Sequence, residues 1–112
     1  MIEFEIEERE GAVVVRPVGR LDMVAAPQFR GVVEEATHKG LHQVIVDFSG
    51  IEFIDSSGLG AVVAGLKKTR QAGGDLRIAN VSGQALMVLE LTTLDRVLKA
   101  HGSVDEALNA NG

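Results

Sequence analysis

Apolar and acidic residues alternate at the start of the chain, which is the pattern of a β-strand with one face toward solvent. Residues 2–7 read Ile-Glu-Phe-Glu-Ile-Glu, and the acidic face suits a strand at the exposed edge of a sheet. Glu10-Gly11 then predicts a turn, and the β-branched run over residues 12–18 predicts a second strand. The two strands together predict a hairpin.

Helix and strand patterns alternate after the hairpin. Pro27 suits the first turn of a helix that ends at Gly40, and the apolar run over residues 43–48 predicts a buried parallel strand. A loop leads from that strand to Asp55, where a second helix begins that ends at Gly73-Gly74. The inward face of the first helix is Phe29, Val32, Val33 and Ala36, and the second has Leu59, Val62, Val63, Leu66 and Arg70 at helical spacing.

The C-terminal third repeats this alternation in shorter elements. Residues 75–79 predict a strand, and Ser82 is a suitable N-cap for a third helix with Leu86 and Leu89 facing inward. Residues 97–99 are a short candidate strand. Ser103 suits the cap of a last helix through Leu108, and residues 109–112 are expected to fray.

The resulting order, β-β-α-β-α-β-α-β-α, predicts an α/β fold. We expect one domain over residues 1–112, with an ordered core at roughly 2–108, built as an open mixed sheet of about 4–5 strands covered by about 4 helices.

Composition and charge exclude several classes of site and partner. The chain has no Cys, which excludes disulfides and thiolate metal sites, and its three His show no metal-ligand spacing, so we expect no metal and no cofactor. The net charge of −5 argues against nucleic acid as a partner. There is no signal-like or membrane-length apolar segment, so we expect a cytoplasmic protein without membrane insertion. The charge pattern favours a monomer.

The segment most suited to chemistry is Asp55-Ser56-Ser57-Gly58-Leu59-Gly60, at a junction between a strand and a helix. The first N–H groups of a helix lack intrahelical partners, and the dipole is positive there. One interpretation is that Ser56 or Ser57 only caps the helix. The other is that a hydroxyl here accepts phosphate, since a helix N-terminus tolerates an anion.

Two glycines so close to a helix start need a reason, because Gly costs about 1 kcal/mol against Ala in a helix interior. Gly58 and Gly60 either keep the surface beside Ser56 bare for another protein or make room for tight packing. The sequence leaves both interpretations open.

The sequence resembles the STAS domain of bacterial anti-anti-sigma factors over nearly its whole length. The likeness rests on Gly19-Arg20-Leu21-Asp22 together with Phe53-Ile54-Asp55-Ser56-Ser57-Gly58-Leu59-Gly60. The resemblance implies that Ser56 is the phosphoacceptor. It also implies a partner-binding surface made of Asp22, Asp55, Ser57, Gly58, Leu59 and Gly60. One departure is that residues 23–27 lack the Ser or Thr common near the start of the family's first helix, which leaves the cap of that helix open.

The resemblance implies a partner-switching circuit for a protein that is not itself an enzyme. The unphosphorylated form is expected to bind an anti-sigma serine kinase, an ATPase of histidine-kinase-like fold, and so to release the sigma factor. Phosphorylation of Ser56 would end that binding, and a metal-dependent serine phosphatase would restore it. Within the same family, the alternative is a subunit of a lipid-transport ATPase complex or a stress-signalling scaffold.

Two enzyme interpretations fit the residues poorly. A dinucleotide fingerprint that starts at Gly58 and Gly60 would need a third glycine where the chain has Val63, and no acidic residue follows the next strand. A serine hydrolase would need a G-x-S-x-G elbow, which is absent.

Overall fold

The alternating N-terminal segment forms the predicted hairpin. In the computed structural model, which describes residues 2–9 and 11–110, β1 (Glu3–Arg9) pairs antiparallel with β2 (Ala12–Leu21). The predicted turn includes Glu10, which lies outside the described residues, and Gly11 has a φ of +69°, a left-handed value that glycine adopts readily.

Parallel strands extend the hairpin into a mixed sheet with the order β1-β2-β3-β5-β6. These added strands are β3 (Gln43–Asp47), β5 (Asp75–Ala79) and the short β6 (Ala100–His101). A further strand, β4 (Ile51–Ile54), pairs in parallel with the last residues of β2, beyond the end of β3. The prediction of an α/β fold with a mixed sheet is therefore confirmed.

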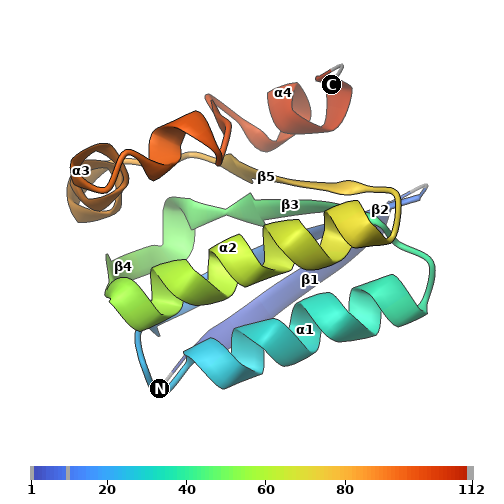
Figure 1. Ribbon diagram of the computed structural model, residues 1–112, viewed down its shortest axis with the longest axis horizontal. Coiled ribbons are helices and arrows are strands. Elements are labelled where there is room, and N and C mark those ends of the chain that lie inside the picture. The colour runs from blue at the N-terminus through green and yellow to red at the C-terminus, as the bar shows by residue number, and fades with distance from the viewer. Residues whose placement is uncertain (1, 10, 111–112) are drawn as a thin grey trace.

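Most of the core lies between the sheet and the helices α1 (Ala26–His38) and α2 (Ser56–Gln71), which run side by side over one face (Figure 1). Alternate residues of β2, β3 and β5 face this core, together with the fully buried Phe29 of α1. On the opposite face, α4 (Val104–Asn109) packs Ala107 against Val14, Ile45 and Ala79. Helix α3 (Gly83–Leu91) lies beside β4.

Several local predictions differ from the structure. The segment before Asp55 was expected to be a loop but contains β4. A strand of four residues is too short for its alternating pattern to be recognised in the sequence. The predicted strand at residues 97–99 ends just before β6, although the carbonyl of Lys99 already accepts a hydrogen bond from the N–H of Ile78. In α3, Leu89 is buried as expected, whereas Leu86 is 38% exposed.

The helix ends also refine the predictions. The Ser103 hydroxyl caps α4 as predicted, accepting from the N–H of Glu106 at 3.1 Å. Ser82 precedes α3 but makes no side-chain cap bond. Asn109, expected to fray, is the last residue of α4, and residues 111–112 lie outside the described residues. Val63 of α2 is half-buried and packs against the core.

Candidate functional site

The side chain of Asp55 organises the start of α2. Its Oδ1 accepts a hydrogen bond from the N–H of Gly58 at 2.8 Å, so Asp55 is the N-cap of the helix. Its Oδ2 accepts from the N–H of Met23 at 3.0 Å, in the connection between β2 and α1. One carboxylate therefore holds two segments together that lie 32 residues apart in the chain.

Asp22 orders the same connection from its other side. Its Oδ1 accepts from the N–H groups of Val24 at 3.1 Å and Ala25 at 3.2 Å, in the turn just before α1. The N-cap residue of α1 itself, Ala25, has no side-chain cap bond. The two carboxylates thus bind three consecutive backbone N–H groups. The loop they hold presents Met23 and Val24 to solvent, with exposures of 69% and 73%. Asp22 and Asp55 therefore lie at one surface, as the family resemblance implies.

Ser56 is exposed and is the first residue of α2, and Ser57 beside it is half-buried. The interpretation that either serine caps the helix is wrong, because Asp55 takes that role. Asp and Ser are both good N-cap residues, so local preference alone does not select among the three positions. With the cap supplied by its neighbour, the Ser56 hydroxyl lies at the positive end of the helix dipole without a capping role.

The two glycines of the motif serve different purposes. A Cβ built on Gly58 would lie 1.9 Å from the carbonyl oxygen of Leu21, so only a glycine lets α2 approach the end of β2 this closely. A Cβ on Gly60 would meet nothing within 4 Å. Gly58 is therefore a packing residue, and Gly60 leaves open space beside Ser56.

The residues of the predicted partner-binding set differ in burial. Gly58 is buried under Leu21, and Leu59 is only 4% exposed. These two residues support the site from below, while Asp22, Asp55, Ser56, Ser57 and Gly60 keep at least part of their surface accessible.

An apolar groove of about 480 Å³ is lined by Ser56 and other residues at the start of α2 and by residues of helix α3. Its walls include these apolar residues: Phe53, Ile54, Leu59, Val88 and Leu94. Sequence reasoning did not find this groove, although the four consecutive apolar residues at 86–89 are more than one buried helix face needs.

Gln84 fixes the position of α3 against this site. Its side-chain amide donates to the carbonyl of Ile54 at 2.8 Å and accepts from the N–H of the same residue at 3.0 Å. The amide thus pairs with β4 as a neighbouring strand would, directly before Asp55. Nothing in the local sequence of Gln84 indicates this contact, which spans 30 residues.

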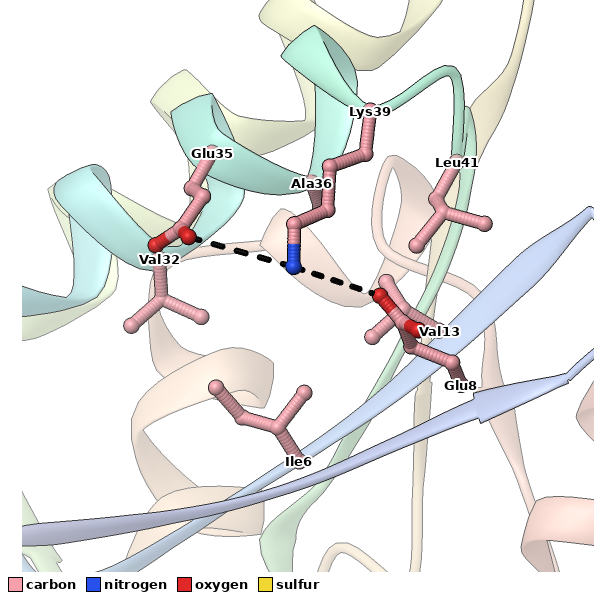
Figure 2. Close-up of a pocket in the computed structure, with 8 residues that line it drawn as sticks. All are labelled: Ile6, Glu8, Val13, Val32, Glu35, Ala36, Lys39 and Leu41. Atoms are coloured by element: carbon pink, nitrogen blue, oxygen red, sulfur yellow. Dashed lines mark hydrogen bonds and ion pairs between the residues drawn. The ribbon is translucent and has the colours of Figure 1, made fainter.

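A second and smaller hollow lies between β1 and α1, away from Ser56 (Figure 2). Ile6 and Val32 line it, and the ammonium group of Lys39 lies 3.4 Å from a carboxylate oxygen of Glu8 and 3.9 Å from one of Glu35. Ile6 pairs with Val15 of β2, six residues before Leu21, so it lies about 20 Å from the end of β2 at the strand rise of about 3.3 Å per residue.

Within residues 2–9 and 11–110, His, Asp and Glu side chains form no cluster of three or more that could hold a metal ion. No helix in the same part of the chain is long and apolar enough to cross a membrane.

Comparisons with known proteins agree with this fold. The family model of the STAS domain matches residues 3–107. The crystal structure of a candidate anti-sigma factor antagonist from Thermotoga maritima is similar at 30% identity and a TM-score of 0.87, over 94% of this chain and 91% of that one. The anti-sigma F factor antagonist of Paenibacillus polymyxa is 25% identical over 96% of this chain and 92% of its own.

A further similar structure is of a phosphorylated protein. The Bacillus cell fate determinant SpoIIAA, solved in its phosphorylated form, is 27% identical with a TM-score of 0.74, over 96% of this chain and 97% of that one. The chain described here belongs to the STAS domain family.

Proposed function

We propose that this protein is an anti-sigma factor antagonist that a partner kinase switches off by phosphorylating Ser56. The observation that carries the proposal is the exposed Ser56 hydroxyl at the start of α2, beside a loop that the carboxylates of Asp22 and Asp55 hold in place. Relatives of similar length named as anti-sigma factor antagonists, one of them solved in a phosphorylated form, support the same role.

In this proposal the kinase supplies the chemistry and this chain supplies the acceptor. The Ser56 oxygen attacks the γ-phosphorus of ATP held by the kinase, an oxygen–phosphorus bond forms, and the bond to the β-phosphate oxygen breaks, which releases ADP. The hydroxyl proton passes to a base of the kinase. A metal-dependent phosphatase returns the serine by hydrolysis. The antagonist itself acts in the cytoplasm, where ATP and both partners are present, and contributes no catalytic group.

Ser56 is the better acceptor of the two serines. A kinase must bring the γ-phosphorus to about 3–3.5 Å from the attacking oxygen. Ser56 is exposed, whereas Ser57 is half-buried in the first turn of α2. The kinase active site therefore reaches Ser56 without disturbing the helix.

The added phosphate should leave the domain folded and break the complex. It brings a charge of about −1.5 to −2 at neutral pH. Within the domain, the N-terminal end of α2 lies next to it and favours an anion. Within the complex, the same charge lies in an interface that fits a neutral hydroxyl and already contains the carboxylates of Asp22 and Asp55, so the charge is desolvated without a new partner.

Phosphate mapping tests this proposal. The purified protein is mixed with Mg-ATP and, in turn, with each anti-sigma serine kinase encoded in the same genome, and phosphate is located by fragmentation mass spectrometry. We expect one phosphate on Ser56, none in Ser56→Ala, and no ATP turnover by the antagonist alone. Phosphate on Ser57 alone would keep the switch but show that Ser57, not Ser56, is the phosphoacceptor. No phosphate with any kinase would contradict the switch and favour a lipid-transport subunit or a stress-signalling scaffold.

The Ser56→Ala variant separates binding from phosphorylation. Since Asp55 caps α2, removal of the Ser56 hydroxyl costs little stability, and the variant should remain folded. It should bind the kinase as well as the wild type does and act as a constitutive activator of the sigma factor. A folded Ser56→Ala protein that fails to bind would count against the switch.

A further inference from the structure

The groove between α2 and α3 is continuous with the proposed phosphorylation site. Asp55 and Ser56 are part of its wall, together with Val88 of α3 and Leu94. Among the described residues that line the groove, Asp55 is the one with a charged side chain. Apolar surface that is open to solvent beside the proposed phosphorylation site favours a bound partner, because covering apolar surface lowers the free energy.

Helix α3 extends this apolar surface outward. Gln84, Val88 and Thr92 follow one another at four-residue spacing along the groove wall, with Thr92 directly after the helix. Met87 and Leu91 form the adjacent row of α3, since residues four apart lie on one side of a helix. Both are solvent-exposed, at 53% and 76%. Their side chains therefore continue the apolar wall of the groove toward the solvent.

We infer that this groove and the Met87–Leu91 row bind an apolar segment of the same kinase that phosphorylates Ser56. The inference rests on the proposed function, because it assigns part of that partner's binding surface. The geometry favours this occupant: Ser56 lies on the groove wall, so a kinase whose active site encloses the Ser56 hydroxyl also covers the groove mouth.

The position of α3 makes this surface rigid before the partner arrives. The two hydrogen bonds of Gln84 to Ile54 hold α3 at a fixed place relative to the residue before Asp55. An interface that is ordered in the free protein loses less conformational entropy on binding. The docking row and the phosphoacceptor are therefore presented to the kinase as one surface, and loss of the dock should weaken both binding and phosphorylation.

Charge substitutions on the exposed row provide the test. Leu91→Lys and Met87→Lys place an ammonium group in the proposed contact at exposed helix positions, where Lys is a good helix former. Ile6→Lys is the matched control, because Ile6 is 53% exposed, as Met87 is, but lies in the distant hollow of Figure 2. Each variant is measured for thermal stability, for affinity to the kinase in Mg-ADP, and for the initial rate of Ser56 phosphorylation at sub-saturating concentration.

We expect Leu91→Lys and Met87→Lys to weaken kinase binding by about tenfold or more and to slow phosphorylation in proportion. Ile6→Lys should stay within about twofold of the wild type in both measurements. Phosphorylation of the wild type on Ser56, together with unchanged affinity of both α3 variants, would overturn the dock and leave the proposed function standing. A wild type that no kinase binds or phosphorylates would overturn both.

A second copy of this protein could also cover the Met87–Leu91 row, and self-association is measured in the same preparations. Analytical ultracentrifugation of the wild type should show a monomer at the concentrations of the binding assay. A dimer that Leu91→Lys dissociates would show that a second copy covers the row and would overturn the kinase assignment.

Discussion

Replacement of each glycine of the motif by alanine should change stability in opposite directions. In Gly58→Ala, the new Cβ would lie 1.9 Å from the carbonyl oxygen of Leu21 and 2.8 Å from its carbonyl carbon. Both are backbone atoms, so a side-chain rotation does not relieve the contact, and the start of α2 must move away from β2. Such overpacking costs about 2 kcal/mol or more.

In Gly60→Ala, the same methyl group enters open space, since no heavy atom lies within 4 Å of the built position. Alanine has a higher helix propensity than glycine, so the substitution should raise the free energy of unfolding by up to about 1 kcal/mol. The two variants make the same chemical change two residues apart in one helix. The difference between them therefore measures the close approach of α2 to β2.

Urea and thermal unfolding measure these free energies. A domain of this size shifts its Tm by about 4 °C per kcal/mol, so Gly58→Ala should melt about 8 °C or more below the wild type and Gly60→Ala up to about 4 °C above it. A Gly58→Ala protein that melts within about 2 °C of the wild type would refute the packing geometry at the start of α2.

Three further substitutions test individual contacts. Asp55→Ala removes both the cap of α2 and the acceptor for the N–H of Met23, so it should cost about 2 kcal/mol in urea unfolding, whereas Asp55→Asn keeps an oxygen acceptor and should cost less. Gln84→Ala leaves two backbone groups at the end of β4 without their partner and should cost about 1–2 kcal/mol; wild-type stability would contradict the pairing. Burial raises the pKa of Asp47, but hydrogen bonds from Asn80 and a nearby backbone N–H outweigh it and hold the pKa below its ordinary value. That carboxylate stabilises the fold above about pH 4, and its contribution is lost as the pH falls through the lowered pKa. The difference in unfolding free energy between wild type and Asp47→Asn should therefore shrink between about pH 6 and pH 2. A constant difference would contradict the lowered pKa of Asp47.

The sequence predicts the parts of this fold that local patterns encode. The alternation at residues 2–7 identified β1, and the apolar run after Gly40 identified β3 as a buried parallel strand. The resemblance carried by the G-x-L-D and D-S-S-G-L-G motifs implied that Asp22 and Asp55 lie at one surface, and both carboxylates bind N–H groups of the same loop.

Contacts between distant residues account for what the sequence did not predict. Strand β4 depends on its pairing with residues 19–21 of β2, and its own four residues are too few to show a period. Asp55 caps α2, and its second carboxylate oxygen accepts from the N–H of Met23, a contact that local sequence does not indicate. The groove beside Ser56 exists because Gln84 pairs with Ile54, a contact that no local pattern contains.

The affinity of the kinase for the antagonist with and without phosphate on Ser56 tests the central claim most directly. Titration calorimetry in Mg-ADP would compare the unmodified protein, the Ser56-phosphorylated protein and Ser56→Ala. We predict that phosphate weakens binding on the order of a hundredfold, which is about 3 kcal/mol, while Ser56→Ala binds as tightly as the unmodified protein. Equal affinity of the phosphorylated and unmodified proteins for the kinase would contradict the switch.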